Sequence, residues 1–298
     1  MRYLCAFLLS LTVWAAASNG WAANRVALVI GNGAYQNVTK LPNPANDAEA
    51  MSAMLKSVGF EVLGGVNLSR DAMVTQVAQF GDSVRSGAEV ALVFYAGHGV
   101  QIAGKNYLIP VDADLHSAYD VKAKTIDADD IVENASGAKV KIVLLDACRD
   151  NPFAEQMEKG DPRLRGMGVN SGLAAMQSGE GTLISFATSP GAAAIDGASD
   201  HSPFTRALLD QLAAPGVEIN EAMLNVRAEV QNETDKQQLP WANTNMTGKF
   251  YMVPTEAAPV VAAIPAASPP APAAGLTDAQ AVETAFWASA EKSGRRDD

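Results

Sequence analysis

A cysteine and a histidine each follow a strongly apolar run in this chain. Cys148 comes shortly after Ile142–Leu145, in L-L-D-A-C-R-D-N-P-F, and His98 comes shortly after Val90–Tyr95, in Y-A-G-H-G. A thiol at the end of a buried strand can attack a carbonyl carbon, and an imidazole beside it can favour the thiolate or protonate the leaving amine. The pattern predicts a cysteine hydrolase with Cys148 as the nucleophile and His98 as the acid and base.

Each of these two residues also has an ordinary structural interpretation. Cys148 would then be a small buried hydrophobe, and His98 a common polar residue. The catalytic interpretation is favoured because Cys148 is the one cysteine left once an N-terminal export signal containing Cys5 is removed, and an unpaired thiol is a liability in an oxidising compartment. His116 and His201 lie in polar stretches with no strand before them, so His98 is the predicted partner.

Residues 1–23 have the pattern of a secretory signal. They contain Arg2, then an apolar stretch, then small residues, and G-W-A at Gly20–Ala22 suits cleavage after Ala22 or shortly past it. The apolar stretch is too short for a membrane span, and no later stretch is apolar for long enough to be one. We therefore expect a periplasmic or secreted protein with no membrane span after signal removal.

The chain is acidic. Its formal net charge is −11 at pH 7, and losing the signal, whose one charged residue is Arg2, makes the charge more negative. An acidic surface repels the phosphates of nucleic acid and of anionic lipid. Nucleic acid is therefore excluded as an expected partner, and neutral or basic proteins and peptides are favoured.

Strand-like and helix-like runs alternate over residues 24–253, which predicts one α/β domain with a mainly parallel sheet. The expected strands are Arg25–Ile30, Phe60–Leu63, Val90–Tyr95, Tyr107–Val111, Ile142–Leu145 and Thr182–Phe186, and the expected helices are Asp47–Val58 and Arg70–Val84. After this domain, residues 254–275 form an Ala/Pro-rich linker. Residues 276–298 have helical spacing and predict a short tail that docks a partner or begins an incomplete module.

In a parallel sheet, the carboxyl ends of the strands meet at one edge, where α/β proteins bind their ligands. We expect His98 and Cys148 to lie together at this edge. The backbone N–H groups of Gly99 and Cys148 are the predicted donors to a developing oxyanion, and the glycines that flank His98 predict a tight turn.

Several further motifs accompany the two residues in a fixed order. They are A-L-V-I-G-N-x-x-Y, which begins in the first expected strand, N-D-A at Asn46–Ala48, N-Y-L-I-P-V-D at Asn106–Asp112 and I-S-F-A-T-S-P-G at Ile184–Gly191. Together with Y-A-G-H-G and D-A-C-R, they make Arg25–Val253 resemble the caspase-like cysteine peptidases, and among these the bacterial metacaspase-related enzymes, or orthocaspases. The resemblance implies the caspase-haemoglobinase fold, an endopeptidase activity and a Cys/His dyad with no essential third member.

The resemblance also implies a substrate preference. In metacaspase-like enzymes an acidic pocket binds the residue on the acyl side of the scissile bond, and Asp47 and Asp146 match its carboxylates. Such a pocket favours substrates with Arg or Lys, because a guanidinium can engage both carboxylates. The alternative for Asp47 is capping of a helix N-terminus, and for Asp146 a strand-end hydrogen bond to a loop.

Many metacaspases need calcium, and Asp112, Asp129 and Asp130 match their cation-binding aspartates in part. Carboxylates suit a hard cation, so a calcium site is one interpretation of this stretch, and a solvated acidic loop is the other. The sequence requires no other cofactor, because one mature cysteine and three scattered histidines give no zinc cluster.

The segment after the nucleophile, Glu155–Gly181, is polar and glycine-rich and contains Lys159, Arg163 and Arg165. In caspase-like enzymes the corresponding linker is often self-cleaved. Basic residues in an exposed loop suit a protease that cuts after Arg or Lys, although they are equally ordinary in any surface loop.

We therefore predict an exported caspase-like cysteine endopeptidase whose substrates are proteins or peptides with basic residues. Two alternatives remain open. One is a catalytically silent caspase-like scaffold that binds peptides or proteins, which the intact Cys148 and His98 disfavour. The other is a Cys-dependent acyl hydrolase, which the missing G-x-C-x-G elbow disfavours.

Overall fold

The computed structural model describes residues 24–148, 153, 156–157, 159, 173–189, 192, 194–197 and 199–255, and for Cys148 it describes the backbone alone. The described residues lie in a unit that ends at Thr255. The predicted signal, the predicted tail and all but the first two residues of the predicted linker lie outside the described residues. Within the described part, no helix combines the length and the apolar character needed to cross a membrane.

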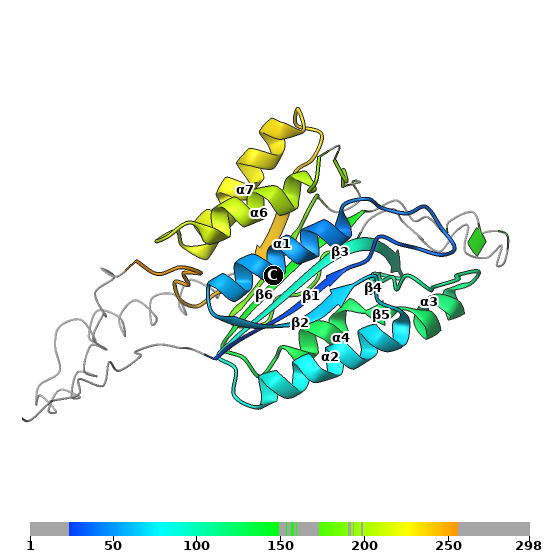
Figure 1. The fold of residues 1–298 in the computed structure, drawn as a ribbon, viewed down its shortest axis with the longest axis horizontal. Helices are drawn as coiled ribbons and strands as arrows, with labels where there is room; N and C mark the ends of the chain where they lie inside the picture. The colour runs from blue at the N-terminus through cyan, green and yellow to red at the C-terminus, as the bar shows by residue number, and fades with distance from the viewer. Residues whose placement is uncertain are drawn as a thin grey trace, which may run out of the picture. The chain divides into compact units, whose positions relative to one another are not determined.

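A mainly parallel sheet forms the centre of the fold (Figure 1). Its strands lie in the order β2 (Phe60–Val66), β1 (Arg25–Gly31), β3 (Val90–Ile102), β6 (Val140–Cys148), β7 (Thr182–Phe186) and β8 (Trp241–Thr244). The first five are parallel, and β8 is antiparallel to β7. Because helices cover both faces, the inner strands are apolar on both sides, which is why they were recognisable as continuous apolar runs.

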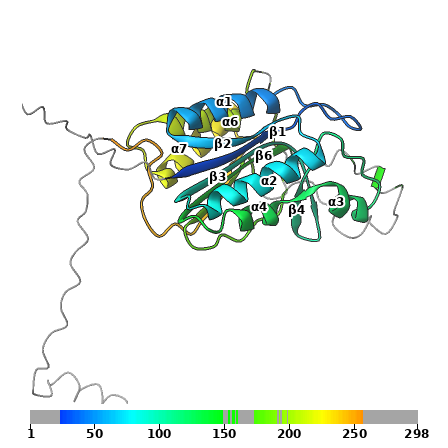
Figure 2. The ribbon, with the colours of Figure 1, turned by 60° about the horizontal axis from the view of Figure 1, so that its bottom comes forward.

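Helices cover the two faces of the sheet unequally (Figures 1 and 2). The helices on one face are α1 (Pro44–Ser57), α6 (Pro203–Ala213) and α7 (Ile219–Glu233), and those on the other are α2 (Arg70–Arg85) and α4 (Ala128–Asn134). Alternate residues of a strand point to opposite faces. Phe94 accordingly packs with the first group of helices, and Val93 with the second.

Strand β3 is longer than the apolar run that predicted it, and this extension corrects the prediction of a tight turn around His98. Residues up to His98 pair with the parallel strand β6, and from Gly99 onward β3 pairs antiparallel with β4 (Lys105–Leu108). β5 (Ile126–Asp127) then pairs with β4. The ladder with β4 keeps the backbone extended beyond His98, so the chain does not turn there.

Other boundaries also differ from the expected ones. Helix α1 begins at Pro44 rather than Asp47, because proline is favoured in the first turn, where its missing N–H costs no hydrogen bond. The expected strand Tyr107–Val111 is shifted to Lys105–Leu108. The acidic stretch before Asp130 is not one loop, because it contains α3 (Ala118–Lys124) and the start of α4.

Candidate active site

The two predicted catalytic residues lie on neighbouring parallel strands. His98 on β3 and Cys148 on β6 are Cα partners, and they are the last pair of that parallel ladder. Adjacent strands are about 4.8 Å apart in the hydrogen-bonding direction. The sheet register therefore brings the backbones of these residues side by side at the carboxyl edge, as the sequence predicted.

Two buried tyrosines hold the backbone of His98. The hydroxyl of Tyr35 accepts the His98 N–H (2.7 Å), and the hydroxyl of Tyr95 donates to the His98 carbonyl oxygen (2.7 Å). The Tyr35 ring also packs against the imidazole, with ring centroids 4.6 Å apart. His98 itself is only 4% exposed. Both polar groups of its backbone are thus satisfied, and the position of its Cα is firmly set.

The imidazole of His98 has a defined orientation. Its Nε2 lies 3.0 Å from the carbonyl oxygen of Thr39, in the loop between β1 and α1. A carbonyl oxygen can only accept a hydrogen bond, so Nε2 carries a proton, and in the neutral ring Nδ1 is then the basic nitrogen. A buried imidazole with a fixed tautomer is suited to accept and return a proton.

The glycines beside His98 are required by close packing rather than by a turn. A Cβ at Gly97 would lie 2.7 Å from Tyr35 Oη and 2.8 Å from Tyr95 Oη, and Gly97 has a φ of +152°. A Cβ at Gly99 would lie 2.9 Å from the Leu173 side chain. Gly97 therefore allows the tyrosines to reach the His98 backbone. The oxyanion role of Gly99 and Cys148 stays a prediction.

Asp47 and Asp146 meet at the same edge of the sheet. Asp47 lies in α1 and Asp146 in β6, and both are buried, at 1% and 7% exposure. Both carboxylates are bound by one segment at the start of α6. Asp47 Oδ1 accepts the Ser202 N–H (3.3 Å), and Asp146 Oδ2 accepts the Ser202 hydroxyl and the Thr205 hydroxyl, the latter at 2.7 Å.

The structural alternatives for the two aspartates were helix capping by Asp47 and a strand-end hydrogen bond of Asp146. Asp47 does not cap its own helix, since the N-cap of α1 is Asn43 and the described bonds of Asp47 reach across to residues before α6. For Asp146, the expected strand-end hydrogen bonds do occur, to Ser202 and Thr205. These bonds leave Oδ1 of Asp146 without a hydrogen bond from the described residues.

A third carboxylate, which the sequence analysis missed, completes the cluster. Asp196 lies in the loop after β7, and its buried Oδ2 has no hydrogen-bond partner among the described residues. Its backbone oxygen accepts from the Asn43 side chain at 2.5 Å. His98 was predicted because ligands bind at the carboxyl ends of parallel strands. The same rule could have indicated Asp196, because its loop follows the carboxyl end of β7.

Burial and mutual repulsion make these carboxylates hard to ionise. Burial, the nearby Asp146 and then Asp196 raise the pKa of Asp47 to about 8, although the Ser202 N–H and Arg206 act in the opposite direction. Burial raises the pKa of Asp146 to about 6 against the two hydroxyl donors, and burial also raises the pKa of Asp196. A cation entering this cluster would relieve the repulsion, so the cluster has the electrostatics of a cation-binding pocket.

His201 is a second residue that sequence reasoning set aside. Its Nδ1 lies 2.9 Å from Asp47 Oδ1, and its side chain is 29% exposed. The polar stretch around it gave no strand signal, because the residue is positioned by the loop that leads into α6.

The proposed calcium ligands do not assemble. Asp112 accepts the N–H of Arg70 at the start of α2 (2.9 Å), and Asp129 lies 3.9 Å from the ammonium of Lys105. Asp130 instead lines a groove between α2 and α4. Within the described ranges, no group of three or more His, Cys, Asp or Glu residues could hold a metal ion. The calcium interpretation is therefore not supported, because hydrogen bonds and ion pairs already engage Asp112 and Asp129.

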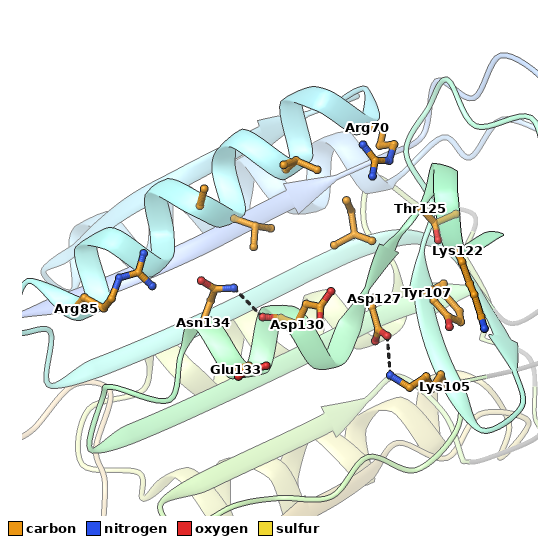
Figure 3. A pocket seen from close by; sticks show the side chains of 14 residues that line it. Arg70, Arg85, Lys105, Tyr107, Lys122, Thr125, Asp127, Asp130, Glu133 and Asn134 are labelled. Atoms are coloured by element: carbon orange, nitrogen blue, oxygen red, sulfur yellow. Dashed lines mark hydrogen bonds and ion pairs between the residues drawn. The ribbon is translucent and has the colours of Figure 1, made fainter. Parts of the chain in front are cut away.

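The groove that contains Asp130 has a volume of about 740 Å³ (Figure 3). Apolar side chains of α2 form part of its wall, and charged residues such as Arg70, Lys105 and Glu133 surround it. None of the candidate catalytic or pocket residues lines it. Among the self-cleavage candidates, Lys159 is exposed, and Arg163 and Arg165 lie outside the described residues.

Comparisons with known proteins identify similar chains. A family model described as the caspase domain matches residues 24–251. The mucosa-associated lymphoid tissue lymphoma translocation protein 1 of Homo sapiens and its homologue in Mus musculus are each 34% identical over 92 residues, which is 31% of this chain and 11% of each relative. The chain thus spans only a small part of the length of these relatives.

A solved structure is also similar. The crystal structure of caspase-1 from Spodoptera frugiperda superposes with a TM-score of 0.56 and 17% sequence identity, covering 79% of this chain and 92% of that one. At this identity the likeness concerns the fold. It confirms the expected α/β architecture with a mostly parallel central sheet and flanking helices.

Proposed function

This chain belongs to the caspase-domain family, and on that premise we propose that it is a cysteine endopeptidase with Cys148 as nucleophile and His98 as acid and base. The observation that carries the proposal is the register that pairs His98 with Cys148 at the carboxyl edge of the sheet. Within the family, the motifs favour the metacaspase-related branch. The N-terminal pattern favours export to the periplasm or the medium.

The proposed reaction has two stages. The Cys148 thiolate attacks the carbonyl carbon of the scissile peptide bond, and backbone N–H groups of Gly99 and Cys148 stabilise the oxyanion. Collapse of the tetrahedral intermediate breaks the C–N bond, while His98 gives a proton to the leaving amine. A thioester remains on Cys148. Water, deprotonated by His98, then hydrolyses the thioester, which releases the new carboxylate and restores the thiol.

We propose that cleavage follows Arg or Lys. The raised pKa values of Asp47 and Asp146 support this preference, because they mark buried carboxyl groups that hold their protons until a cation balances their charge. Asp196 joins them as a third member of the pocket. A substrate guanidinium or ammonium would supply the missing charge and pair with the carboxylate oxygens that face no described donor.

A peptide-library assay on the mature protein tests the proposal. We expect cleavage after Arg and Lys, and no cleavage by Cys148→Ala or His98→Ala proteins that retain the wild-type melting temperature. Undiminished cleavage by either variant would refute the catalytic assignment. Preferential cleavage after Asp would refute the acidic pocket.

The same assay separates the two alternative functions. A silent scaffold would bind library peptides without cleaving them. An acyl hydrolase would hydrolyse small esters but leave peptides intact.

A further inference from the structure

His201 contacts the carboxylate that the proposed substrate has to reach. Asp47 is 1% exposed, whereas the His201 side chain, whose Nδ1 is 2.9 Å from Asp47 Oδ1, is 29% exposed. The imidazole is therefore the more exposed member of the pair. A substrate side chain that takes Asp47 Oδ1 has to replace the contact with His201.

The contact with Asp47 is also the one hydrogen bond described for the His201 ring. The neighbouring backbone is held independently, because Ser202 caps α6 by accepting the Thr205 N–H (2.9 Å) and also donates its hydroxyl to Asp146. Rotation of the His201 side chain toward solvent thus breaks one described contact and leaves the start of α6 in place.

We propose that His201 is a specificity-determining residue of the acidic pocket: its imidazole is the resident partner of Asp47, and the Arg or Lys side chain of a substrate replaces it. This inference rests on the proposed function, since it assumes that Asp47 and Asp146 receive the basic residue. A neutral substrate side chain would not form an ion pair with Asp47 in place of the lost hydrogen bond to the imidazole. The exchange therefore favours substrates with a cationic side chain.

The charges around the pair are consistent with such an exchange. Asp146 and Asp196 repel negative charge on Asp47, and Arg206 is the described cation that acts on it. Arg206 is already paired with Glu233. A substrate cation that enters the cluster therefore relieves this repulsion.

Steady-state kinetics with three matched peptides test the inference. The peptides end in Arg, in Lys or in citrulline, which has the shape of arginine without its charge. We expect His201→Ala to lower KM for the Arg and Lys peptides roughly 3- to 10-fold, because one hydrogen bond to Asp47 no longer has to be broken. The change in kcat and in the citrulline rates should be small. His201→Asn keeps a hydrogen-bond donor, so its KM for the Arg and Lys peptides should lie between those of the wild type and His201→Ala.

A matched control exists in the same chain. His116 Nε2 lies 2.9 Å from Asp114 Oδ1, and that pair is more exposed. His116→Ala should leave all three peptides unaffected. An increase in KM for the Arg peptide in His201→Ala, or no change relative to His116→Ala, would overturn the inference and assign His201 to holding Asp47 in position.

A binding experiment on the Cys148→Ala protein separates this inference from the proposed function. The probe is the uncleaved Arg peptide, and the readout is the imidazole ¹⁵N signal of His201 alongside calorimetric binding. Binding that shifts this signal to the value of a solvent-exposed ring supports the exchange. Binding with an unchanged signal overturns the exchange and leaves the pocket intact. Absence of binding overturns the pocket and the exchange with it.

Discussion

At the scale of residues, His98 is the best-defined group of the site. Its N–H, its carbonyl and its ring each have a partner, supplied by Tyr35, Tyr95 and Thr39. These partners come from different segments, so the imidazole is positioned by tertiary contacts rather than by its own strand alone. Groups that act on reacting atoms need this kind of support, because small displacements reduce catalysis strongly.

Removing the Tyr35 hydroxyl should therefore reduce turnover. Tyr35→Phe leaves the buried N–H of His98 without its acceptor, a loss of about 1–3 kcal/mol that a shift of His98 would partly relieve. We expect kcat to fall roughly tenfold with little change in KM. Tyr107→Phe is the control, since Tyr107 is a buried tyrosine of the same apolar cluster. Equal kcat in the two variants would show that Tyr35 only stabilises the fold.

The raised pKa of Asp47 leads to a second prediction about a single residue, which concerns how the stability of the protein depends on pH. Its pKa is about 8 in the folded protein against an ordinary value of 3.8, so between these values the folded state holds a proton that the unfolded state has released. The contribution of Asp47 is greatest below its unfolded pKa and is lost as pH rises toward 8. The free energy of unfolding should therefore fall by up to about 1.4 kcal/mol per pH unit in this window.

Urea unfolding from pH 5 to pH 8 measures this effect. Asp47→Asn cannot ionise, so it should gain stability relative to the wild type as pH rises. Asp71→Asn is the control, because the Asp71 side chain is 97% exposed. A constant difference between wild type and Asp47→Asn across the range would show that Asp47 titrates normally.

At the scale of elements, the site depends on how β3 changes partners. Up to His98 the strand pairs with β6, and beyond it with β4. The change of partner takes place where the parallel sheet ends, so His98 stays beside Cys148 while the chain continues extended. The start of α6 makes the other contribution, since its cap Ser202 binds both Asp47 and Asp146.

A methyl group at Gly97 should disturb the end of β3. The added Cβ would lie 2.9 Å or less from Asn32 O and from both tyrosine hydroxyls, and the φ of +152° is unfavourable for alanine. We expect Gly97→Ala to destabilise the fold by about 1–3 kcal/mol and to reduce cleavage, as measured by thermal unfolding and peptide assay. Gly248→Ala is the matched control, because no atom lies within 4 Å of its added Cβ. Equal melting temperatures for the two variants would contradict the packing argument.

At the scale of the whole molecule, the parallel sheet gathers residues that are distant in sequence. Asp47 and His201 are 154 positions apart, and Asp146 and Ser202 are 56 apart, yet each pair is hydrogen-bonded at the same edge. Both faces of the sheet are covered by helices, so the carboxyl edge is where loops can shape a pocket. The candidate catalytic and pocket residues are therefore concentrated at one edge of the domain.

The predicted signal gives a prediction for the exported protein. If residues 1–23 are a secretory signal, the exported protein should begin near Ala23 or Asn24, directly before β1. Mass spectrometry of the exported protein measures its N-terminus, with a variant carrying Asp in place of Leu8 and Leu9 as the control that should not be exported. An intact Met1 on exported protein would refute the signal.

The sequence by itself determined the central strands, the α/β class and the pairing of Cys148 with His98. Buried parallel strands are apolar on both faces, so they stand out as short runs, and the residues after them share one edge in any such sheet. Local patterns carried this information because strand formation follows from contiguous apolar segments, and parallel strands end at a common edge. The same patterns could not show that β3 continues beyond His98, since that depends on the partner strand β4.

Only the tertiary structure decided the composition of the pocket. Asp196 and His201 lie in the segment between β7 and α6, where no periodicity marks them, and they reach Asp47 because α6 and α1 pack on the same face of the sheet. Tertiary contacts also decided the fate of the predicted calcium ligands, since Asp112 accepts the Arg70 N–H and Asp129 lies beside the Lys105 ammonium. The contact of His201 with Asp47 depends on how the start of α6 packs beside α1, and no local pattern in the chain encodes that packing.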